Sequence, residues 1–432
     1  MIEWVNRCLL GVAVPVQLMI MGIYFGFRLK WFHILHPVKI VRYALSGDKK
    51  KAFSALTLAL AGTLGVGNMV GVASAIALGG CGAVFWMWLS AAFAMILKYS
   101  EIALSIRHRS ADGRGGAMYY IKDIFSLRGA QGTGRILSGI FAALLVLCAL
   151  TMGSALQSRA AADALERGFS VPAWAGAAVL SLLTLSVCAF GKGGVMRTAV
   201  RIVPLMTLTV LILSGAVLIL RAREIPSAFL RIFKEAFEPC AAGGGIFGFI
   251  LSDALRMGTM RGLISNEAGC GTSPTAHAES SSASAARQGI WGIFEVFVDT
   301  ILLCTVTALV IIVSGAPLNT ADLMGIVLGA YSSVLGKWAE YAVAAAIFCF
   351  GFATVICWSH YGAEGVYYLC PRPSARRVFV ALLAVAVFFG GIFSAELAWQ
   401  TSDLAVGAMT VINLFVLLLG EREIVEETRR LP

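Results

Sequence analysis

The sequence predicts an all-α integral membrane protein. This expectation rests on its composition, on the number of its apolar runs and on two glycine-rich interruptions. Apolar residues make up 59% of the 432 residues, and charged residues only 13%. A soluble chain of this length could not bury so much apolar surface. Uncharged, glycine-containing membrane segments in corresponding places of two halves are typical of a secondary-transporter binding site.

Apolar runs of roughly 20 residues, the length that crosses a bilayer as a helix, occur about eleven times. We expect spans near residues 6–27, 52–78, 83–106, 136–160, 171–190, 198–220, 242–264, 288–314, 339–362, 377–393 and 396–420. The first is read as a retained helix, because Glu3 precedes it and a basic stretch, with no small-residue cleavage site, follows it. We therefore expect a single membrane transport domain over 1–432, with residues 1–30 as an extra N-terminal helix.

The net charge of +10 is a signal of membrane orientation. Basic residues collect in alternate loops, above all in 28–51, 107–135 and 372–377. Loops rich in Lys and Arg stay on the cytoplasmic side, which predicts an external N-terminus and a cytoplasmic C-terminus. We expect a multi-pass protein of the plasma (inner) membrane with the lipid bilayer as its partner, and no binding of nucleic acid.

The ten spans after the first divide into two halves of five, residues 52–220 and 241–420. Each half opens with a glycine-interrupted segment. Because five is an odd number, the second half enters the membrane from the opposite side, which is the geometry of an inverted repeat. This prediction rests on the glycine positions and the span count, since the halves share no obvious residue identity.

The first interruption is expected within 52–78, where Gly62-Thr63-Leu64-Gly65-Val66-Gly67-Asn68 lies mid-span. A straight helix of that length would be about 40 Å long, longer than a hydrocarbon core of about 30 Å. An unwound centre exposes carbonyl groups that can hold a cation and amides that can hold a carboxylate. Close helix packing on small residues explains the glycines equally well. The second interruption is expected at 243–248, which reads Gly-Gly-Gly-Ile-Phe-Gly.

Glu295 and Asp299 are two carboxylates inside one span. They are four residues apart and so lie on one helix face. A charged side chain at membrane depth is costly and points to function by default. The alternative is a structural ion pair with Lys98, Arg256 or Arg261, and the sequence favours neither interpretation.

Several long motifs, in order along nearly the whole chain, resemble the alanine or glycine:cation symporter family. They are Ala61–Ala73 with Ala83–Trp88, Lys98-Tyr99-Ser100-Glu101, Gly115–Tyr120, Arg261–Gly271 and Gln288–Thr300. The resemblance implies sodium-coupled carriers of small neutral amino acids on the leucine-transporter fold, a five-plus-five inverted repeat of helices. It also implies that the first span is an additional helix.

The resemblance further implies a binding site, matched by position. The substrate residues would be Thr63, Gly65, Gly67, Asn68, Gly153, Gln157, Gly244, Gly245, Phe247 and Trp358. One sodium site would use the Ala61 and Leu64 carbonyls with the Thr354 hydroxyl, and a second would use Thr63 and Asn68. The chemistry agrees, because Gln157 offers a donor and an acceptor without charge, as a zwitterion requires. Arg159, where the family more often has asparagine, could point outward or face the pocket and attract an acidic substrate.

We therefore expect a symporter that takes up alanine, glycine or a similar amino acid with Na⁺ as coupling ion, by alternating access and without another cofactor. The alternatives are a proton-coupled carrier using Glu295 or Asp299, a carrier of acidic amino acids, and a non-transporting amino-acid sensor. An enzyme is not expected, because the five histidines are dispersed and no HExxH motif occurs. The oligomeric state stays open.

Overall fold

The computed structural model describes residues 13–46, 49–237, 253–280, 284–318, 322–394 and 396–431, and these residues form helices and connecting turns without a strand. The α-helices are α2 (Val14–Arg28), α3 (Phe32–Leu35), α4 (Pro37–Leu45), α5 (Lys49–Thr63), α6 (Val70–Gly79), α7 (Ala83–Arg107), α8 (Ala117–Leu127), α9 (Gln131–Leu150), α10 (Leu156–Phe169), α11 (Ala173–Ala189), α12 (Gly191–Leu220), α13 (Ile225–Ala236), α15 (Asp253–Asn266), α16 (Pro274–His277), α17 (Ala285–Val296), α18 (Thr305–Val313), α19 (Leu323–Leu335), α20 (Trp338–Leu369), α21 (Pro373–Ile392), α22 (Glu396–Leu419) and α23 (Glu421–Arg429).

Seven helices in the described residues are long and apolar enough to cross a membrane. Two of them are continuous through a π-helical turn, at Thr151–Ala155 between α9 and α10 and at Phe297–Cys304 between α17 and α18. Shorter apolar helices, among them α2, α6, α11 and α19, accompany them. The all-helical membrane fold is thus confirmed, whereas the full count of eleven spans and the additional N-terminal helix stay predictions.

The first interruption lies where the sequence places it. Helix α5 ends at Thr63, a single 3₁₀ turn covers Val66–Asn68, and α6 begins at Val70. Of the two explanations of the glycines, the break rather than an uninterrupted helix describes residues 62–70, and it agrees with the surplus length of the span.

The described residues contain a second interruption, different from the one predicted at 243–248, and it lies between α15 and α16. Glu267, Gly269 and Gly271 all have positive φ angles, of 53°, 82° and 76°. A left-handed backbone conformation of this kind ends a helix and is most readily adopted by glycine, which occupies two of the three positions. The predicted interruption at Gly244, Gly245 and Phe247 lies outside the described residues.

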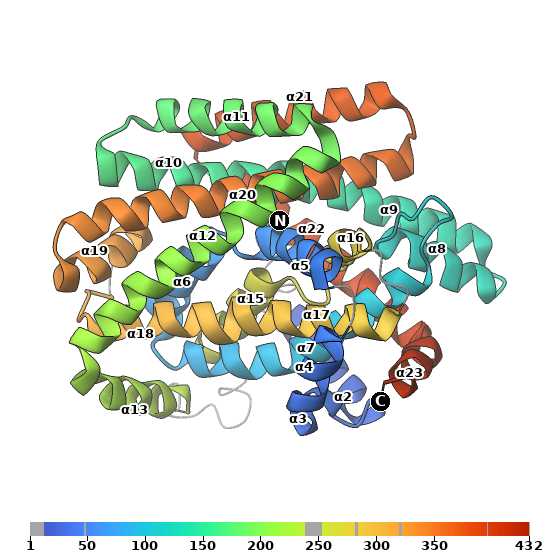
Figure 1. Cartoon of the computed structure of the whole chain (residues 1–432), viewed down its shortest axis with the longest axis horizontal. Helices are drawn as coiled ribbons and strands as arrows, with labels where there is room; N and C mark the ends of the chain where they lie inside the picture. Colours follow the sequence, from blue (N-terminus) through green and yellow to red (C-terminus); the bar gives the residue numbers. More distant parts are fainter. Residues whose placement is uncertain are drawn as a thin grey trace.

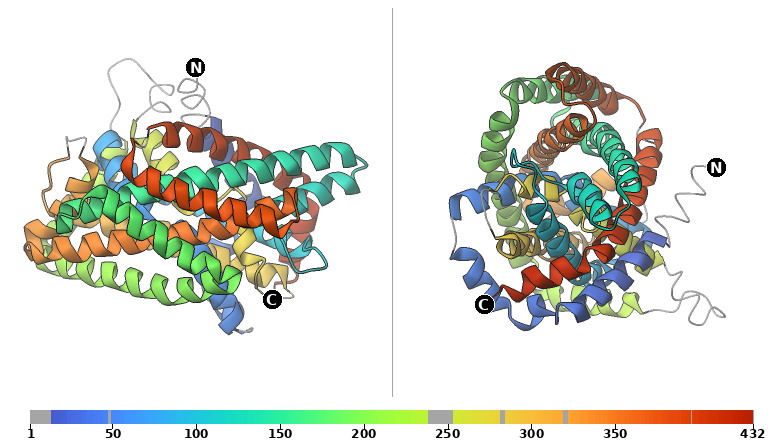
Figure 2. Two further views of the ribbon diagram at one scale, coloured as in Figure 1. Left: turned by 90° about the horizontal axis from the view of Figure 1, so that it is seen from above. Right: turned by 90° about the vertical axis from the view of Figure 1, so that its right-hand side faces the viewer.

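Both interruptions sit inside the bundle. In Figure 1, α5, α15 and α16 lie at the centre, between α10, α11 and α21 on one side and α7 and α13 on the other. Helix α15 packs on α6 and α7, and α20 packs on α5 and α10. The right-hand view of Figure 2 looks along the long helices, which surround this centre. The interrupted segments are therefore shielded from lipid, as unwound backbone requires.

Candidate functional site

A cavity of about 110 Å³ opens at the first interruption. Residues from both sides of the break meet the middle of the α9–α10 helix, α15, α19, α20 and α22 around it. Its lining includes Gly62, Thr63, Gly65, Val66, Gly67, Val70, Gly71, Ser74, Met152, Leu156, Gln157, Ala160, Arg261, Ile264, Ser265, Glu267, Leu323, Thr354, Trp358 and Trp399. Five of the predicted substrate residues, namely Thr63, Gly65, Gly67, Gln157 and Trp358, line this one space.

The backbone of the first interruption is held open by redirected hydrogen bonds. The Gly65 amide donates to the Thr63 carbonyl and to Asn68 Oδ1, at 2.8 and 3.1 Å. The Asn68 amide donates to the Gly65 carbonyl at 3.2 Å. In a continuous helix these two amides would bond to the carbonyls of Ala61 and Leu64. The interruption therefore frees the Ala61 and Leu64 carbonyls from these two helical bonds, and they are the carbonyls that the family resemblance implies as sodium ligands.

Gly65 is required by close packing at this point. A Cβ atom there would lie 2.9 Å from Thr354 Oγ1 and 3.1 Å from Gln157 Oε1. Gly67 and Gly71 differ, because a Cβ atom at either would meet nothing within 4 Å. Gly65 thus lets α20 and α10 approach the break, whereas Gly67 and Gly71 keep the cavity wide.

The Gln157 side chain links the unwound backbone to α10 by hydrogen bonding. Its Oε1 accepts a hydrogen bond from the Val66 amide at 3.3 Å, and its Nε2 donates to the Met152 carbonyl at 3.3 Å. Both bonds are at the long end of the normal range. Gln157 is therefore placed where it can exchange these weak bonds for bonds to a ligand.

Trp358 and Gly153 form a packed pair in which only the tryptophan lines the cavity. Trp358 is fully buried, and a Cβ atom on Gly153 would lie 2.2 Å from Trp358 Cγ. Gly153 therefore supports the indole from behind, which differs from the substrate-facing position that the resemblance implied.

Two hydroxyl groups lining the cavity are buried and have no hydrogen-bond partner among the described residues. They are Thr354 Oγ1, which faces Gly65, and Ser74 Oγ on α6. Buried hydroxyl groups without a partner are uncommon in folded proteins. These two are free to bind a ligand, and Thr354 lies beside the break that releases the Ala61 and Leu64 carbonyls.

Asp299 is fully buried beside the interruption, and Asn68 joins it to the unwound segment. Asn68 Nδ2 donates to Asp299 Oδ1 at 2.7 Å, while Ser265 Oγ and Thr300 Oγ1 donate to Oδ2 at 2.7 and 2.8 Å. Asn68 itself is buried and does not line the cavity, so its predicted role as a direct substrate contact does not match its position. It connects the break to a carboxylate instead.

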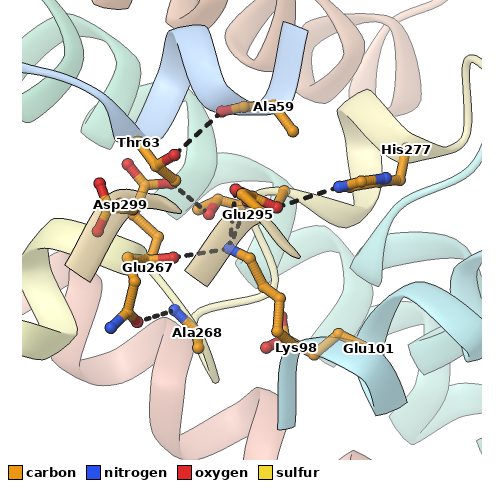
Figure 3. Close-up of polar contacts among 12 residues, drawn as sticks. Ala59, Thr63, Lys98, Glu101, Glu267, Ala268, His277, Glu295 and Asp299 are labelled. Atoms are coloured by element: carbon orange, nitrogen blue, oxygen red, sulfur yellow. Dashed lines mark hydrogen bonds and ion pairs between the residues drawn. The ribbon is translucent and has the colours of Figure 1, made fainter. Parts of the chain in front are cut away.

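Glu295, one helical turn away, belongs to a different cluster (Figure 3). It lies 3.3 Å from Lys98 Nζ and accepts hydrogen bonds from Ser273 and His277 Nε2, the latter at 3.0 Å. Lys98 also donates to the Asn266 carbonyl at 2.7 Å. Of the two interpretations, the structural ion pair with Lys98 describes Glu295, whereas Asp299 lies beside the cavity region.

The second interruption is held by side chains from other helices. Glu101 on α7 accepts hydrogen bonds from the amides of Gly269 and Gly271, and Asn413 on α22 donates to the Gly269 carbonyl at 2.8 Å. Lys98 was predicted only as one of three candidate partners in a structural ion pair, and no role was predicted for Glu101. Two charged residues three positions apart in an apolar span were the signal that could have identified them.

Negative charge is in excess around the two interruptions. Lys98 and the cavity-lining Arg261 carry positive charge in this part of the described chain, whereas four carboxylates, those of Glu101, Glu267, Glu295 and Asp299, are at most 2% exposed. Glu267 lines the cavity and accepts a hydrogen bond from Thr272 Oγ1 at 2.6 Å. Buried carboxylates in such number require protons or cations to neutralise them.

Arg159 does not face the cavity. Its Nη1 lies 3.5 and 3.4 Å from the carbonyls of Gly391 and Ile392, on α21. The basic side chain that lines the cavity is Arg261, whose Cζ lies 5.5 Å from the ring centre of Trp399. The acidic-substrate hypothesis based on Arg159 therefore loses its structural support.

Glu279, His360 and Glu364 bring possible metal-ligand atoms within 4.8 Å of one another, away from the cavity. Both carboxylates already have basic partners, because Lys192 pairs with Glu279 and Arg114 binds Glu364 through contacts of 2.7 and 2.6 Å. Burial raises the pKa of Glu279, but His360 and Lys192 outweigh it and hold that pKa below its ordinary value. The cluster is therefore an ion-pair network rather than a metal site.

Comparisons with known proteins agree with this geometry. The sodium/alanine symporter AgcS of Methanococcus maripaludis is 33% identical, over 99% of this chain and 96% of its own length. The probable sodium/glutamine symporter GlnT of Bacillus subtilis is 32% identical, over 96% of this chain and 86% of its own.

Solved structures share the fold at low sequence identity. MhsT in complex with L-phenylalanine matches with a TM-score of 0.60 at 15% identity, over 87% of this chain and 91% of that one. A Na⁺-coupled sialic acid symporter matches with a TM-score of 0.56 at 14% identity, over 98% and 96% of the two chains. The protein thus has the leucine-transporter fold.

The family profile described as the sodium:alanine symporter family matches residues 1–431. With the interrupted helices, the cavity between them and relatives that are membrane transporters, this chain belongs to the sodium:alanine symporter family.

Proposed function

We propose that the protein is a secondary active transporter that carries a small neutral amino acid together with Na⁺ by alternating access. The observation that carries the proposal is one cavity bounded by unwound backbone, by the side-chain amide of Gln157 and by two buried hydroxyl groups that have no partner in the described part of the chain. This set of groups can bind a zwitterion and an ion together, because it offers both donors and oxygen ligands without requiring a fixed opposite charge.

The size of the cavity supports a small substrate. A volume of about 110 Å³ is far below the ~300–1,000 Å³ of pockets that take drug-sized ligands. Trp358 closes one side and packs directly on Gly153, so that side cannot recede. Amino acids with side chains of the size found in alanine, glycine and serine fit these limits, and Arg261 at the lining favours a ligand with a carboxylate.

Two groups of oxygen atoms are the proposed sodium ligands. The first consists of the Ala61 and Leu64 carbonyls, which lack their helical bonds from the amides of residues 65 and 68, with Thr354 Oγ1, which has no hydrogen-bond partner among the described residues. The second consists of the Asp299 carboxylate with the side-chain oxygens of Ser265 and Asn68. In this structure the side-chain NH₂ group of Asn68 points at Asp299. To bind a cation there, the side chain would have to turn so that its oxygen faces Asp299 instead. Oxygen ligands of this kind are those that hard cations prefer.

Coupling follows from the shared backbone. In the mechanism that we propose, sodium binds first and fixes the segment 61–68, and the amino acid then binds to amides that this order has exposed. Each ligand orders the segment and so lowers the entropic cost of binding the other, and each therefore raises the affinity for the other. One sodium charge moving through 100 mV adds about 2.3 kcal/mol to the driving force.

Reconstituted liposomes test the proposal. Labelled alanine, glycine, serine and glutamate are supplied with an inward sodium gradient, with a proton gradient alone, and with neither. We expect accumulation of the neutral amino acids under the sodium gradient only. Uptake under the proton gradient alone would assign coupling to protons, and binding of labelled alanine without flux would identify a sensor.

A further inference from the structure

The strongest unassigned feature is a basic cavity of about 630 Å³, at the end of the molecule that holds the arginine-rich loops. It lies between the end of α11, the start of α12, the end of α20 and the start of α21. Its basic lining residues are Arg114, Lys192, Arg372, Arg376 and Arg377, with Glu364 as the acidic one. Nothing in the transport mechanism above uses this cavity.

The charges in this cavity are only partly neutralised. Glu364 binds Arg114, and Lys192 pairs with Glu279. Arg372, Arg376 and Arg377 have no ion-pair partner in the part of the chain that the structure describes, and all three side chains are exposed. The cavity therefore retains an excess of three positive charges.

The arginines are brought to the cavity by the local backbone. Gly191, the first residue of α12 after the turn at Phe190, has a φ angle of 62°, and a Cβ atom there would lie 3.2 Å from Arg376 Nη2. The turn thus lets the Arg376 guanidinium reach across from α21. Arg372 is the N-cap residue of the 20-residue α21 and lines the cavity, so the positive end of that helix dipole lies at the cavity.

Part of the remaining lining is apolar, and it borders the exposed apolar faces of α11 and α21. Leu185, Val366 and Val380 belong to the lining. Helices α11 and α21 pack side by side (Figure 1), and their outer faces carry Leu182 and Leu382, which are 66% and 52% exposed. A ligand that matches both parts has an anionic head and an apolar tail.

We propose that this cavity binds the phosphate-bearing headgroup of an anionic membrane lipid, with the acyl chains on the α11–α21 face. Basic pockets between membrane helices are suited to such headgroups. A free phosphate offers the same anionic group but leaves the apolar surface unused, which favours the lipid as its source.

Native mass spectrometry and thermal unfolding of the purified full-length chain test this proposal. The probes are phosphatidylglycerol, phosphatidylcholine and inorganic phosphate. The test variant is Arg372→Gln/Arg376→Gln/Arg377→Gln. The matched control is Lys122→Gln/Arg135→Gln/Arg422→Gln, which removes three exposed basic residues at the same end of the molecule but outside the cavity.

We expect the unchanged protein to retain phosphatidylglycerol over phosphatidylcholine and to unfold at a higher temperature with it. At roughly fivefold for each basic side chain, the test variant should lose about a hundredfold in affinity. The control should keep its preference for phosphatidylglycerol. An Ala381→Phe variant, which keeps every charge and fills the cavity, should also lose the lipid. This second variant tests the cavity independently if the triple variant fails to fold.

Three results would overturn the proposal. Equal losses in the test and control variants would mean that net charge alone attracts the lipid. No preference for phosphatidylglycerol in the unchanged protein would mean that the arginines bind no lipid and are solvated residues that only set the orientation of the protein in the membrane. Stabilisation by inorganic phosphate with none by phosphatidylglycerol would assign the cavity to a soluble anion.

Discussion

Replacing Asp299 with asparagine is expected to weaken sodium binding while leaving the fold intact. Three donors converge on this carboxylate from Asn68, Ser265 and Thr300, at 2.7, 2.7 and 2.8 Å. An asparagine keeps the shape but has one acceptor oxygen, so its NH₂ group faces at least one of these donors. Hydrogen bonds to a charged group contribute about 1.5–3 kcal/mol each, against about 0.5–1.5 kcal/mol for neutral ones.

The expected magnitude follows from the loss of the charged ligand of the second proposed sodium site. Removing a partner that only orients a metal's ligands typically costs about 10- to 100-fold in affinity, and we take this range as the minimum for Asp299. We therefore expect the sodium concentration for half-maximal alanine uptake to rise by at least about 10- to 100-fold, or about 1.4–2.7 kcal/mol. The assay is labelled alanine uptake into liposomes across a series of sodium concentrations, normalised to reconstituted protein.

Glu295→Gln is the matched control. Glu295 lies on the same helix, four residues away, and is as fully buried as Asp299. Its partner is Lys98, so the substitution leaves a buried ammonium without its ion pair, which costs about 3–5 kcal/mol in folding stability. The protein that remains folded should show unchanged sodium dependence. An unaltered sodium dependence in Asp299→Asn, or a larger change in Glu295→Gln than in Asp299→Asn, would refute the reasoning.

Three further predictions concern other parts of the molecule. Gly153→Ala places a methyl group 2.2 Å from Trp358 Cγ, so it should push the indole into the cavity, cost about 1–3 kcal/mol in stability and reduce serine uptake more than glycine uptake; equal losses would contradict it. Thr354→Val removes a buried hydroxyl without a described partner, so unfolding temperature should stay level or rise while the sodium requirement increases, and a destabilised variant with normal sodium dependence would contradict the assignment. The hydrogen bond from His108, opposed by partial burial, holds the pKa of Glu423 below its ordinary value; a lowered carboxyl pKa stabilises the docked α23 above the ordinary carboxyl pKa, and this contribution is lost as the pH falls through the lowered pKa. Hydrogen exchange in α23 should therefore show more local opening as the pH falls below the ordinary glutamate pKa of about 4.3, with a smaller change in Glu423→Gln, and an equal change in both proteins would exclude this contact.

The fold could be predicted from the sequence because its main determinants are local. A run of apolar residues predicts a spanning helix without reference to any other segment. Gly65, Gly67 and the surplus length of span 52–78 located the first interruption, since a helix longer than the bilayer must bend or break. Trp358, Thr354 and Gln157 followed from the family resemblance, and all three line the same cavity.

The second interruption depends on contacts that no local pattern contains. Residues 267–273 leave the helical form because Glu101, Lys98 and Asn413, on two other helices, satisfy the exposed backbone groups. The interruption predicted from the glycine run at 243–248 lies outside the described residues and stays a prediction. Polar Asn266 and Glu267 in a membrane span were the local signal of the break at 267–273. Separating Asp299 from Glu295 likewise required the positions of Asn68 and Lys98, which lie far away in the sequence.

The most direct test of the central claim is an experimental structure of the protein with bound alanine and sodium. The account predicts alanine in the cavity, in hydrogen-bond contact with the backbone of residues 65–67 and with Gln157. It also predicts ion density at the Ala61 and Leu64 carbonyls and Thr354 Oγ1. Alanine bound elsewhere, or a site in which residues 61–68 close into a continuous helix, would contradict it.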